Sequence, residues 1–244
     1  MSLDDPSRVN EIRGRIHEKG FLRKFYEEVY SKYQDVANRC PEGGLLIELG
    51  SGAGFVKEVI PKVITSDTIP YEGNDRVIDA MNMPFKEGEL SGIFLMNVFH
   101  HIPDVGAFLR EASRCLRPGG RIFIFDQHVG WISSFVLKYL HHEPFNPSSE
   151  KWDFDSTGPL SDANGALAWI VFQRDRQKFE RDFAGLKLER YTPHSPLRYW
   201  ISGGLKNWSL LPGGAFGAAS AVDQALVKVS ANFGSFVDIE LVKR

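Results

Sequence analysis

The chain has 244 residues, of which 43% are hydrophobic and 25% charged, which suits one soluble globular domain or two small ones. Its 29 Lys and Arg nearly balance its 31 Asp and Glu, for a net charge of −2. Binding to nucleic acid needs a clear cationic excess, so we expect no nucleic-acid partner. The two cysteines, Cys40 and Cys115, exclude a disulfide framework.

The N-terminal residues are charged and lack the apolar region of a signal peptide. No run reaches the roughly 20 apolar residues that a membrane-spanning helix needs. The longest uncharged run, 207–222, is broken by Pro212-Gly213-Gly214. The sequence therefore predicts a cytoplasmic protein in a reducing compartment.

The first 40 residues show helical periodicity. Phe21, Phe25, Val29 and Tyr33 recur every four residues with charges between them, which predicts one or two amphipathic helices. Residues 41–44, Pro-Glu-Gly-Gly, end this region.

Beyond this break, short apolar runs alternate with helical patterns. We expect strands at 45–49, 63–66, 76–78, 93–96 and 122–125, and helices at 55–60 and 105–116. Such alternation predicts an α/β fold with a doubly wound, mostly parallel sheet and helices on both faces.

Composition changes near residue 130, because all five tryptophans and the turn-rich runs lie beyond it. Within this half, 166–183 has a helical pattern and 186–191 the pattern of a strand. Residues 236–241 alternate apolar and acidic side chains, which predicts a last, antiparallel strand with one wet face.

A glycine loop follows the first predicted strand in the run LLIELGSGAG. Gly50, Gly52 and Gly54 allow a sharp turn and a close approach of backbone to ligand. The helix expected after the loop would add free N–H groups and a positive dipole end.

Three carboxylates stand at successive strand ends: Glu48, Asp67 and Asp79. Asp67, 19 residues after Glu48, can accept both hydroxyls of a ribose, so the set indicates a nucleoside-containing ligand. The third glycine comes one residue too early for a dinucleotide fingerprint, which disfavours a nicotinamide cofactor.

Four segments in unbroken order, over residues 45–126, carry a family resemblance. They are LLIELGSGAG, VITSDTIP, VIDAMNMPFKEGELSGIFLMNVFHHIPD and FLREASRCLRPGGRIFIFD. Together they resemble the class I S-adenosylmethionine-dependent methyltransferases, especially the type 11-like group that acts on small molecules. The resemblance implies a Rossmann-like, seven-stranded sheet with its last strand antiparallel.

The implied layout is a single domain over 1–244. Residues 1–40 would form a helical cap, 41–130 the cofactor-binding half, 131–234 a substrate-side half with irregular insertions, and 235–244 the last strand. The family's cofactor contacts fall here on Glu48, Gly50, Ser51, Gly52, Gly54, Asp67, Thr68, Asp79, Ala80, Met81, Asn97 and His100. Residues 68–75 leave no room for the usual helix between the second and third strands, so the adenine side should be more open.

The methyl acceptor needs alignment and, where it carries a proton, a base. Related small-molecule O-methyltransferases imply His100 or His101 and Asp126 for these roles, and His128 is a further candidate. The structural alternatives remain open: a histidine ring could bond a loop carbonyl, and Asp126 could cap the next helix.

His141, His142, Glu143 and His194 suggest a metal site, in which the His-His-Glu run could hold a divalent ion together with Asp153 and Asp155. Adjacent histidines point apart on a helix, and Pro144 places Glu143 in a loop. We therefore assign no metal and expect a solvated or substrate-facing segment.

Aromatic side chains of the second half suit an apolar acceptor pocket or sugar stacking. They are Trp152, Phe154, Trp169, Tyr199 and Trp200. The apolar run around Trp169 favours core packing there, while Trp152 and Tyr199 fit either role.

The segment 197–221 is rich in glycine and poor in charge. It suits a flexible lid over the site better than a membrane-contacting surface. The turn-rich second half also resembles methyltransferases among surface-polysaccharide enzymes.

We expect a methyltransferase that acts on a small molecule, at an oxygen of a sugar, a lipid-linked sugar or another metabolite. Two alternatives stay open. A nicotinamide-dependent oxidoreductase would bind NADH, whereas a non-catalytic S-adenosylmethionine-binding module would bind the sulfur ligand without a working base.

Overall fold

The computed structural model describes residues 5–141 and 143–244. The helices are α1 (Val9–Glu18), α2 (Gly20–Ala37), α3 (Val105–Cys115), α4 (Trp131–Tyr139), α5 (Leu167–Trp169), α6 (Arg176–Asp182), α7 (Arg198–Ser202) and α8 (Phe216–Val229). The strands are β1 (Leu45–Leu49), β2 (Ile64–Asp67), β3 (Arg76–Val77), β4 (Leu90–Met96), β5 (Leu116–Gln127), β6 (Leu186–His194) and β7 (Phe236–Lys243). Short 3-10 turns lie at Pro6–Arg8, Val56–Glu58, Phe99–His101, Gly213–Ala215 and Ala231–Phe233, and a π-helical turn at Ile170–Arg174.

All seven strands form one sheet in the order β3-β2-β1-β4-β5-β7-β6. The pairs from β3 to β5 are parallel, and β7 runs antiparallel to both of its neighbours. The predicted Rossmann-like fold with an antiparallel last strand is confirmed. Because β1, β2 and β4 are parallel, their carboxyl ends meet at one edge, where such sheets bind ligands.

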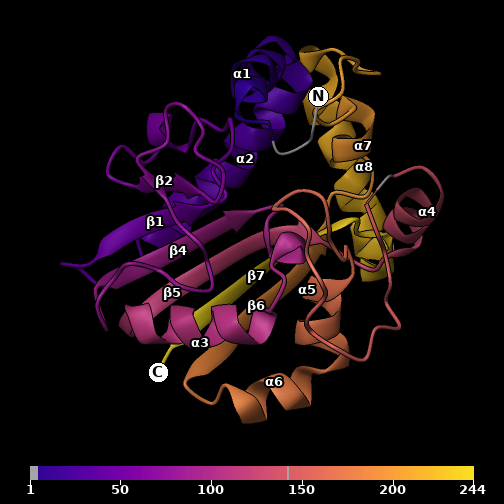
Figure 1. Cartoon of the computed structure of the whole chain (residues 1–244). Helices are drawn as coiled ribbons and strands as arrows, with labels where there is room; N and C mark the ends of the chain where they lie inside the picture. Colours follow the sequence, from indigo (N-terminus) through magenta and orange to yellow (C-terminus); the bar gives the residue numbers. More distant parts are fainter. Residues whose placement is uncertain (1–4, 142) are drawn as a thin grey trace.

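Helices cover both faces of the sheet (Figure 1). The four-residue spacing of aromatics in α2 turns one stripe onto the sheet. Tyr33 stacks on Phe94 of β4 at 4.8 Å, and Phe25 meets Phe125 of β5 edge to face at 5.7 Å. The amphipathic α3 covers the opposite face together with α5 and α6 (Figure 1). The N-terminal helices thus belong to the core and form one wall above the ligand-binding edge.

The prediction of a helix at 55–60 is wrong. Residues 55–62, all within the described part of the chain, form only a 3-10 turn at Val56–Glu58. Aromatic packing explains this: Phe55 lies against Tyr30 and Tyr26 of α2 at 5.0 and 6.1 Å. The ligand edge therefore lacks the long helix dipole that the sequence pattern suggested, and the loop's own backbone must supply the donors.

The prediction that one face of the last strand is exposed to solvent is also wrong. Asp238 and Glu240 of β7 are buried. Asp238 pairs with His194 and Lys32, and Glu240 is bonded by Arg39 and Arg121. These cations come from α2, its C-terminal end and the neighbouring strands. Pairing of this kind offsets the cost of burying two carboxylates.

The helical segment predicted at 166–183 is present but broken into α5, a π-helical turn and α6. Trp152 packs in the core near Phe183 and donates its Nε1–H to Asp175 Oδ2 at 2.8 Å. Phe154 and Trp169 pack against the same core. These three aromatics are therefore structural and do not belong to an acceptor pocket.

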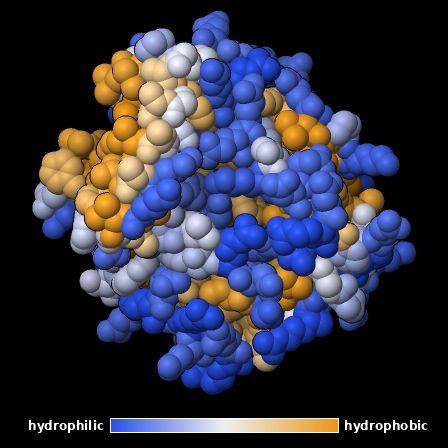
Figure 2. Space-filling model, turned by 180° about the vertical axis from the view of Figure 1, so that it is seen from behind, coloured by the Kyte–Doolittle hydropathy of each residue, from blue (hydrophilic) through white to orange (hydrophobic). Residues whose placement is uncertain are grey.

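Exposed apolar side chains gather on the side of the molecule formed by α4, α7 and α8 (Figure 2, left). Those on α4 and the 205–210 segment are Trp131, Phe135, Tyr139, Leu140, Leu205, Trp208 and Leu210. None of the helices in the described ranges is both long and apolar enough to cross a membrane.

Candidate functional site

A cavity of about 910 Å³ opens at the carboxyl ends of β1, β2 and β4. Every residue that the resemblance assigned to cofactor binding lines it: Glu48, Gly50, Ser51, Gly52, Gly54, Asp67, Thr68, Asp79, Ala80, Met81, Asn97 and His100. A volume of this size lies within the range of cofactor and ligand pockets. The motif residues thus meet at one place.

The loop after β1 turns through left-handed backbone at two glycines. Gly50 has φ +68°, and a Cβ there would lie 2.3 Å from Val98. Gly52 has φ +50°, but no atom of the described residues lies within 4 Å of a Cβ at this position, so it faces open space in the cavity. Gly50 is required for packing, whereas Gly52 leaves room for a ligand close to the backbone.

Asp67 ends β2 and braces this loop. Its Oδ2 accepts from Gly52 N–H at 3.0 Å, and its Oδ1 accepts from Ile69 N–H at 3.1 Å. Burial raises the pKa of Asp67, while these backbone donors oppose the shift. Each oxygen keeps a further lone pair with which it could accept a ligand hydroxyl.

Two buried oxygens at the loop lack a partner within the described part of the chain: Glu48 Oε2 and Asn97 Oδ1. Burial raises the pKa of Glu48 to about 8. Asn97 has φ +55°, an uncommon conformation that persists where the surroundings impose it. Unsatisfied acceptors of this kind are costly, and a ligand that brings an ammonium group would satisfy them.

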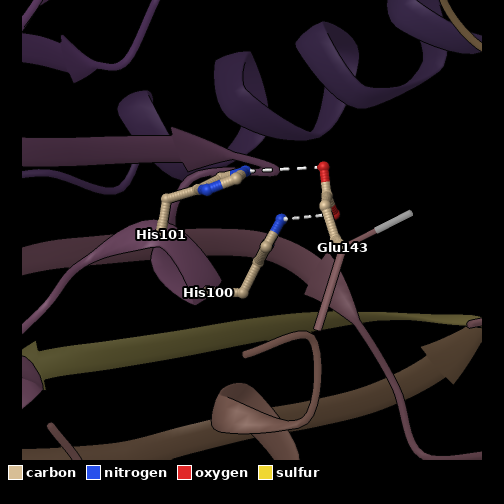
Figure 3. Close-up of side chains that lie close together, drawn as sticks. All are labelled: His100, His101 and Glu143. Atoms are coloured by element: carbon tan, nitrogen blue, oxygen red, sulfur yellow. Dashed lines mark ion pairs between the residues drawn. The ribbon is translucent and has the colours of Figure 1, made fainter. Parts of the chain in front are cut away.

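The same cavity is also lined by a histidine–carboxylate cluster. His100 and His101 come from the turn after β4, and Glu143 comes from the segment after α4 (Figure 3). His100 Nε2 lies 3.4 Å from Glu143 Oε2, and His101 Nε2 lies 3.7 Å from Glu143 Oε1. His100 Nδ1 is 2.6 Å from Asp126 Oδ1 on β5.

The two histidines differ in electrostatics. Burial alone would lower the pKa of His100, but Asp126 and Glu143 raise it to about 10. Burial, with the charge of His100, lowers the pKa of His101 to about 4. His101 Nδ1 donates to the Asp162 carbonyl at 3.0 Å. At neutral pH His100 is therefore a cation between two carboxylates, and His101 is neutral with its Nε2 lone pair toward Glu143.

The structure separates the predicted acid and base candidates. Asp126 is fully buried behind His100 and reaches the cavity only through that ring. His128 does not line the cavity and is bonded through Nδ1 to the Tyr191 hydroxyl at 2.8 Å, which disfavours a role as the base. His194 is engaged with Asp238.

The ion site considered at 141–143 with Asp153 and Asp155 does not form as imagined. His142 lies outside the described residues. Asp153 and Asp155 do not line the cavity, and Asp153 instead pairs with Asp104 in a β-bridge. Glu143, by contrast, turns into the cavity, where Gln127 Nε2 donates to its Oε2 at 3.3 Å.

Several residues that line the cavity were not predicted from the sequence. They are Tyr26 and Tyr30 of α2, Gln127, Val136, Leu140 and the 156–160 loop. Of the aromatics expected in an acceptor pocket, Tyr199 and Trp200 do line it. Gly203, Gly204, Leu205, Lys206 and Trp208 of the segment 197–221 line it as well. The sequence signal that pointed to a role for Glu143 was the run His-His-Glu at 141–143.

Comparison with protein families locates the similarity in the part of the chain that holds the glycine loop. The Methyltransferase domain family matches residues 47–124, from β1 to β5. The matched segment is thus a methyltransferase domain, and S-adenosylmethionine is the cofactor that this domain indicates. The match disfavours the nicotinamide alternative.

Curated relatives match a short stretch of this chain. The 27-O-demethylrifamycin SV methyltransferase of Amycolatopsis mediterranei is 37% identical over 57 residues, covering 22% of this chain and 21% of that protein. The chloroplastic tocopherol O-methyltransferase of Arabidopsis thaliana is 32% identical over 59 residues, 24% of this chain and 17% of that protein. The matched segment thus spans about a fifth of the length of these relatives.

A solved structure supports the fold over nearly the whole chain. It belongs to the complex between the Haloferax volcanii Trm112 methyltransferase activator and a methyltransferase. The similarity has a TM-score of 0.50 at 17% identity and covers 96% of this chain and 98% of that one.

Proposed function

We propose that this protein transfers the methyl group of S-adenosylmethionine to an oxygen of a small acceptor that carries a large apolar part. One observation carries the proposal: a single cavity joins the glycine loop, Glu48 and Asp67 to the cluster of His100, His101 and Glu143. Cofactor and acceptor can therefore meet inside one enclosure, as methyl transfer requires.

We assign the cofactor's parts by the donors and acceptors that line the cavity. The unpartnered Glu48 Oε2 and Asn97 Oδ1 suit the ammonium of the methionine end. Asp67 suits the ribose hydroxyls, and Asp79 to Met81 the adenine. The bound cofactor supplies a methyl group on a positively charged sulfur, so no further activation of the methyl is needed.

The acceptor end must hold a hydroxyl and remove its proton. His101 is neutral at pH 7 and presents Nε2 to the cavity, so we assign it the proton. Glu143 stabilises the resulting imidazolium, and His100 can donate to an acceptor oxygen. Asp126 fixes the orientation of the His100 ring and acts as a positioning residue.

The rim of the cavity supports an acceptor with an apolar part. Leu140, Leu205 and Trp208 line the cavity and are also exposed, so the cavity continues into the apolar surface of Figure 2. Exposed apolar patches of this kind accept apolar ligands or surfaces. This favours a lipid-linked sugar among the expected acceptors and a peripheral contact with membranes through 197–221. The names of two curated relatives, an O-methyltransferase and a methyltransferase of an O-demethylated compound, agree with oxygen as the target atom.

The first test is calorimetric titration with S-adenosylmethionine and S-adenosylhomocysteine, with NADH as the control ligand. We expect binding of both sulfur ligands and about 100-fold weaker binding by Asp67→Ala, since two charge-assisted hydrogen bonds are lost. Asp35→Ala, which removes an exposed carboxylate on α2, should bind normally.

The second test is transfer of labelled methyl to lipid extracts and to water-soluble sugar nucleotides. Label in the lipid fraction that disappears with His101→Gln supports the proposal. Cofactor binding without transfer to either fraction would favour a non-catalytic module, and binding of NADH alone would overturn the whole assignment.

A further inference from the structure

We infer that His100, His101 and Glu143 form a binding site for a divalent transition-metal cation. One ligand atom from each residue lies within 4.8 Å of the others, at the wall of the cavity (Figure 3). Two histidines and one carboxylate are the protein ligands of many catalytic zinc and non-haem iron sites, which leave further positions open.

The distances inside the cluster suit two ligands of one ion better than hydrogen bonds. An N–H···O hydrogen bond spans about 2.7–3.2 Å. The two His–Glu143 contacts are longer, at 3.4 and 3.7 Å. Ligands about 2.0–2.2 Å from a tetrahedral zinc ion lie roughly 3.3–3.6 Å apart. An ion could therefore enter after small movements of the side chains.

The outer partners of the cluster provide a second, independent argument. A metal-ligating histidine usually donates its other ring N–H to a carboxylate or a backbone carbonyl. Both histidines do so: His100 Nδ1 to Asp126 at 2.6 Å, and His101 Nδ1 to the Asp162 carbonyl at 3.0 Å. These bonds aim both Nε2 atoms at Glu143, which is itself held by Gln127. Each of the three ligands is thus oriented by another residue.

The donor set selects the class of cation. Mg²⁺ and Ca²⁺ prefer oxygen ligands, whereas two imidazoles and one carboxylate suit Zn²⁺, Fe²⁺ or Co²⁺. Asp104, Asp153 and Asp155 do not line the cavity, so the cluster offers one carboxylate and no oxygen-rich cage.

A role for the ion in the reaction rests on the proposed function. An acceptor hydroxyl bound at the open position would become more acidic and release its proton to solvent. The oxygen lone pair then forms the C–O bond, and the C–S bond breaks with its electron pair left on sulfur. With the ion bound, both Nε2 atoms are ligands, so the ion takes over the deprotonation assigned to His101 and the contact to the acceptor oxygen assigned to His100, with no change in oxidation state.

The test uses the full chain, freed of metal by chelation. We expect titration with Zn²⁺ to saturate at one ion per chain with a Kd in the micromolar range or tighter, and Co²⁺ to give the visible absorption of low coordination number. Glu143→Gln and His101→Asn should each weaken Zn²⁺ binding at least tenfold. His17→Gln, which removes a histidine outside the cluster, should not, and Mg²⁺ should not compete.

The outcomes separate the two proposals. Absence of saturable binding, or binding that is unchanged in both cluster variants, would overturn the site. If S-adenosylhomocysteine binds normally to the chelated protein and to Glu143→Gln, the cofactor assignment stands whatever the metal result. Full methyl transfer by the chelated protein would overturn the role of the ion in the reaction. Circular dichroism of both variants identifies any loss of fold.

Discussion

The proposed cofactor end of the cavity is built from the carboxyl ends of β1, β2 and β4, whereas the rest of the lining, the proposed acceptor end, comes from segments scattered from Arg8 to Phe236. The cofactor end depends on local sequence, since its ligand-facing groups lie at or directly after the ends of strands. The acceptor end needs α2, α4, α7 and several loops to pack correctly before any pocket exists. Changes at the cofactor end should therefore act through single contacts, and changes at the acceptor end through positioning.

The largest expected effect belongs to the cofactor end. Gly50→Ala places a Cβ 2.3 Å from Val98 in left-handed backbone, so strain and overpacking combine. We expect a loss of about 3 kcal/mol, a Tm lower by about 10 °C and no measurable binding of S-adenosylhomocysteine. Thermal unfolding and calorimetry check this.

Two other glycines sharpen the result. At Gly52 a Cβ would meet open space, although φ is +50°. Gly52→Ala should therefore lower stability less than Gly50→Ala but still weaken binding of the cofactor. At Gly214 a Cβ would meet open space and the backbone is not left-handed. Gly214→Ala should therefore change neither stability nor cofactor binding. If Gly50→Ala has the same Tm and the same affinity for S-adenosylhomocysteine as the wild type, the loop does not have the assigned role.

At the acceptor end, Asp126→Asn should slow methyl transfer about 100-fold while cofactor affinity stays within threefold. Without this carboxylate, one of the two groups that raise the pKa of His100 is lost, so that pKa falls below about 10. Nuclear magnetic resonance titration of the imidazole nitrogens and single-turnover rates measure the two effects. The matched control is Asp238→Asn, which alters a buried Asp–His pair outside the cavity. Equal losses in the two variants would mean that Asp126 is only structural.

Glu48 links cofactor binding to pH. Its pKa is about 8 in the free protein, so the carboxyl is mostly protonated at pH 7. An ammonium beside it lowers this pKa, and about 0.9 of a proton should leave on binding at pH 7, falling to none above about pH 9. Calorimetry in buffers of different ionisation enthalpy measures this release. It should vanish in Glu48→Gln, and a release that persists there must come from another group.

The smallest effects are expected at the apolar rim. Leu140→Ser and Trp208→Ala should each raise the KM for an apolar acceptor about tenfold and leave kcat and cofactor affinity unchanged. Leu210→Ser is the matched control, because Leu210 is exposed on the same side but does not line the cavity. An equal effect of all three would point to a general surface contact with the lipid.

The order of the elements and the cofactor end could be predicted from the sequence because their determinants are local. Five apolar runs became β1 to β5, and the pattern at 236–241 became the antiparallel β7. The helix at 55–60 could not be predicted correctly, because Phe55 packs on α2 instead of continuing a helical turn. The wet face of β7 failed for a similar reason: the cations that neutralise Glu240 come from positions 39 and 121.

By itself, then, the sequence determined the glycine loop, the acids at the strand ends and the parallel core, since strand, turn and side-chain alternation depend on neighbours in the chain. Only the tertiary structure decided which histidines face the cavity. It turned His100 and His101 toward Glu143, some 40 residues away, and His128 toward Tyr191. That choice depends on packing between distant segments, because burial and charge partners from those segments set both the direction and the protonation of each ring.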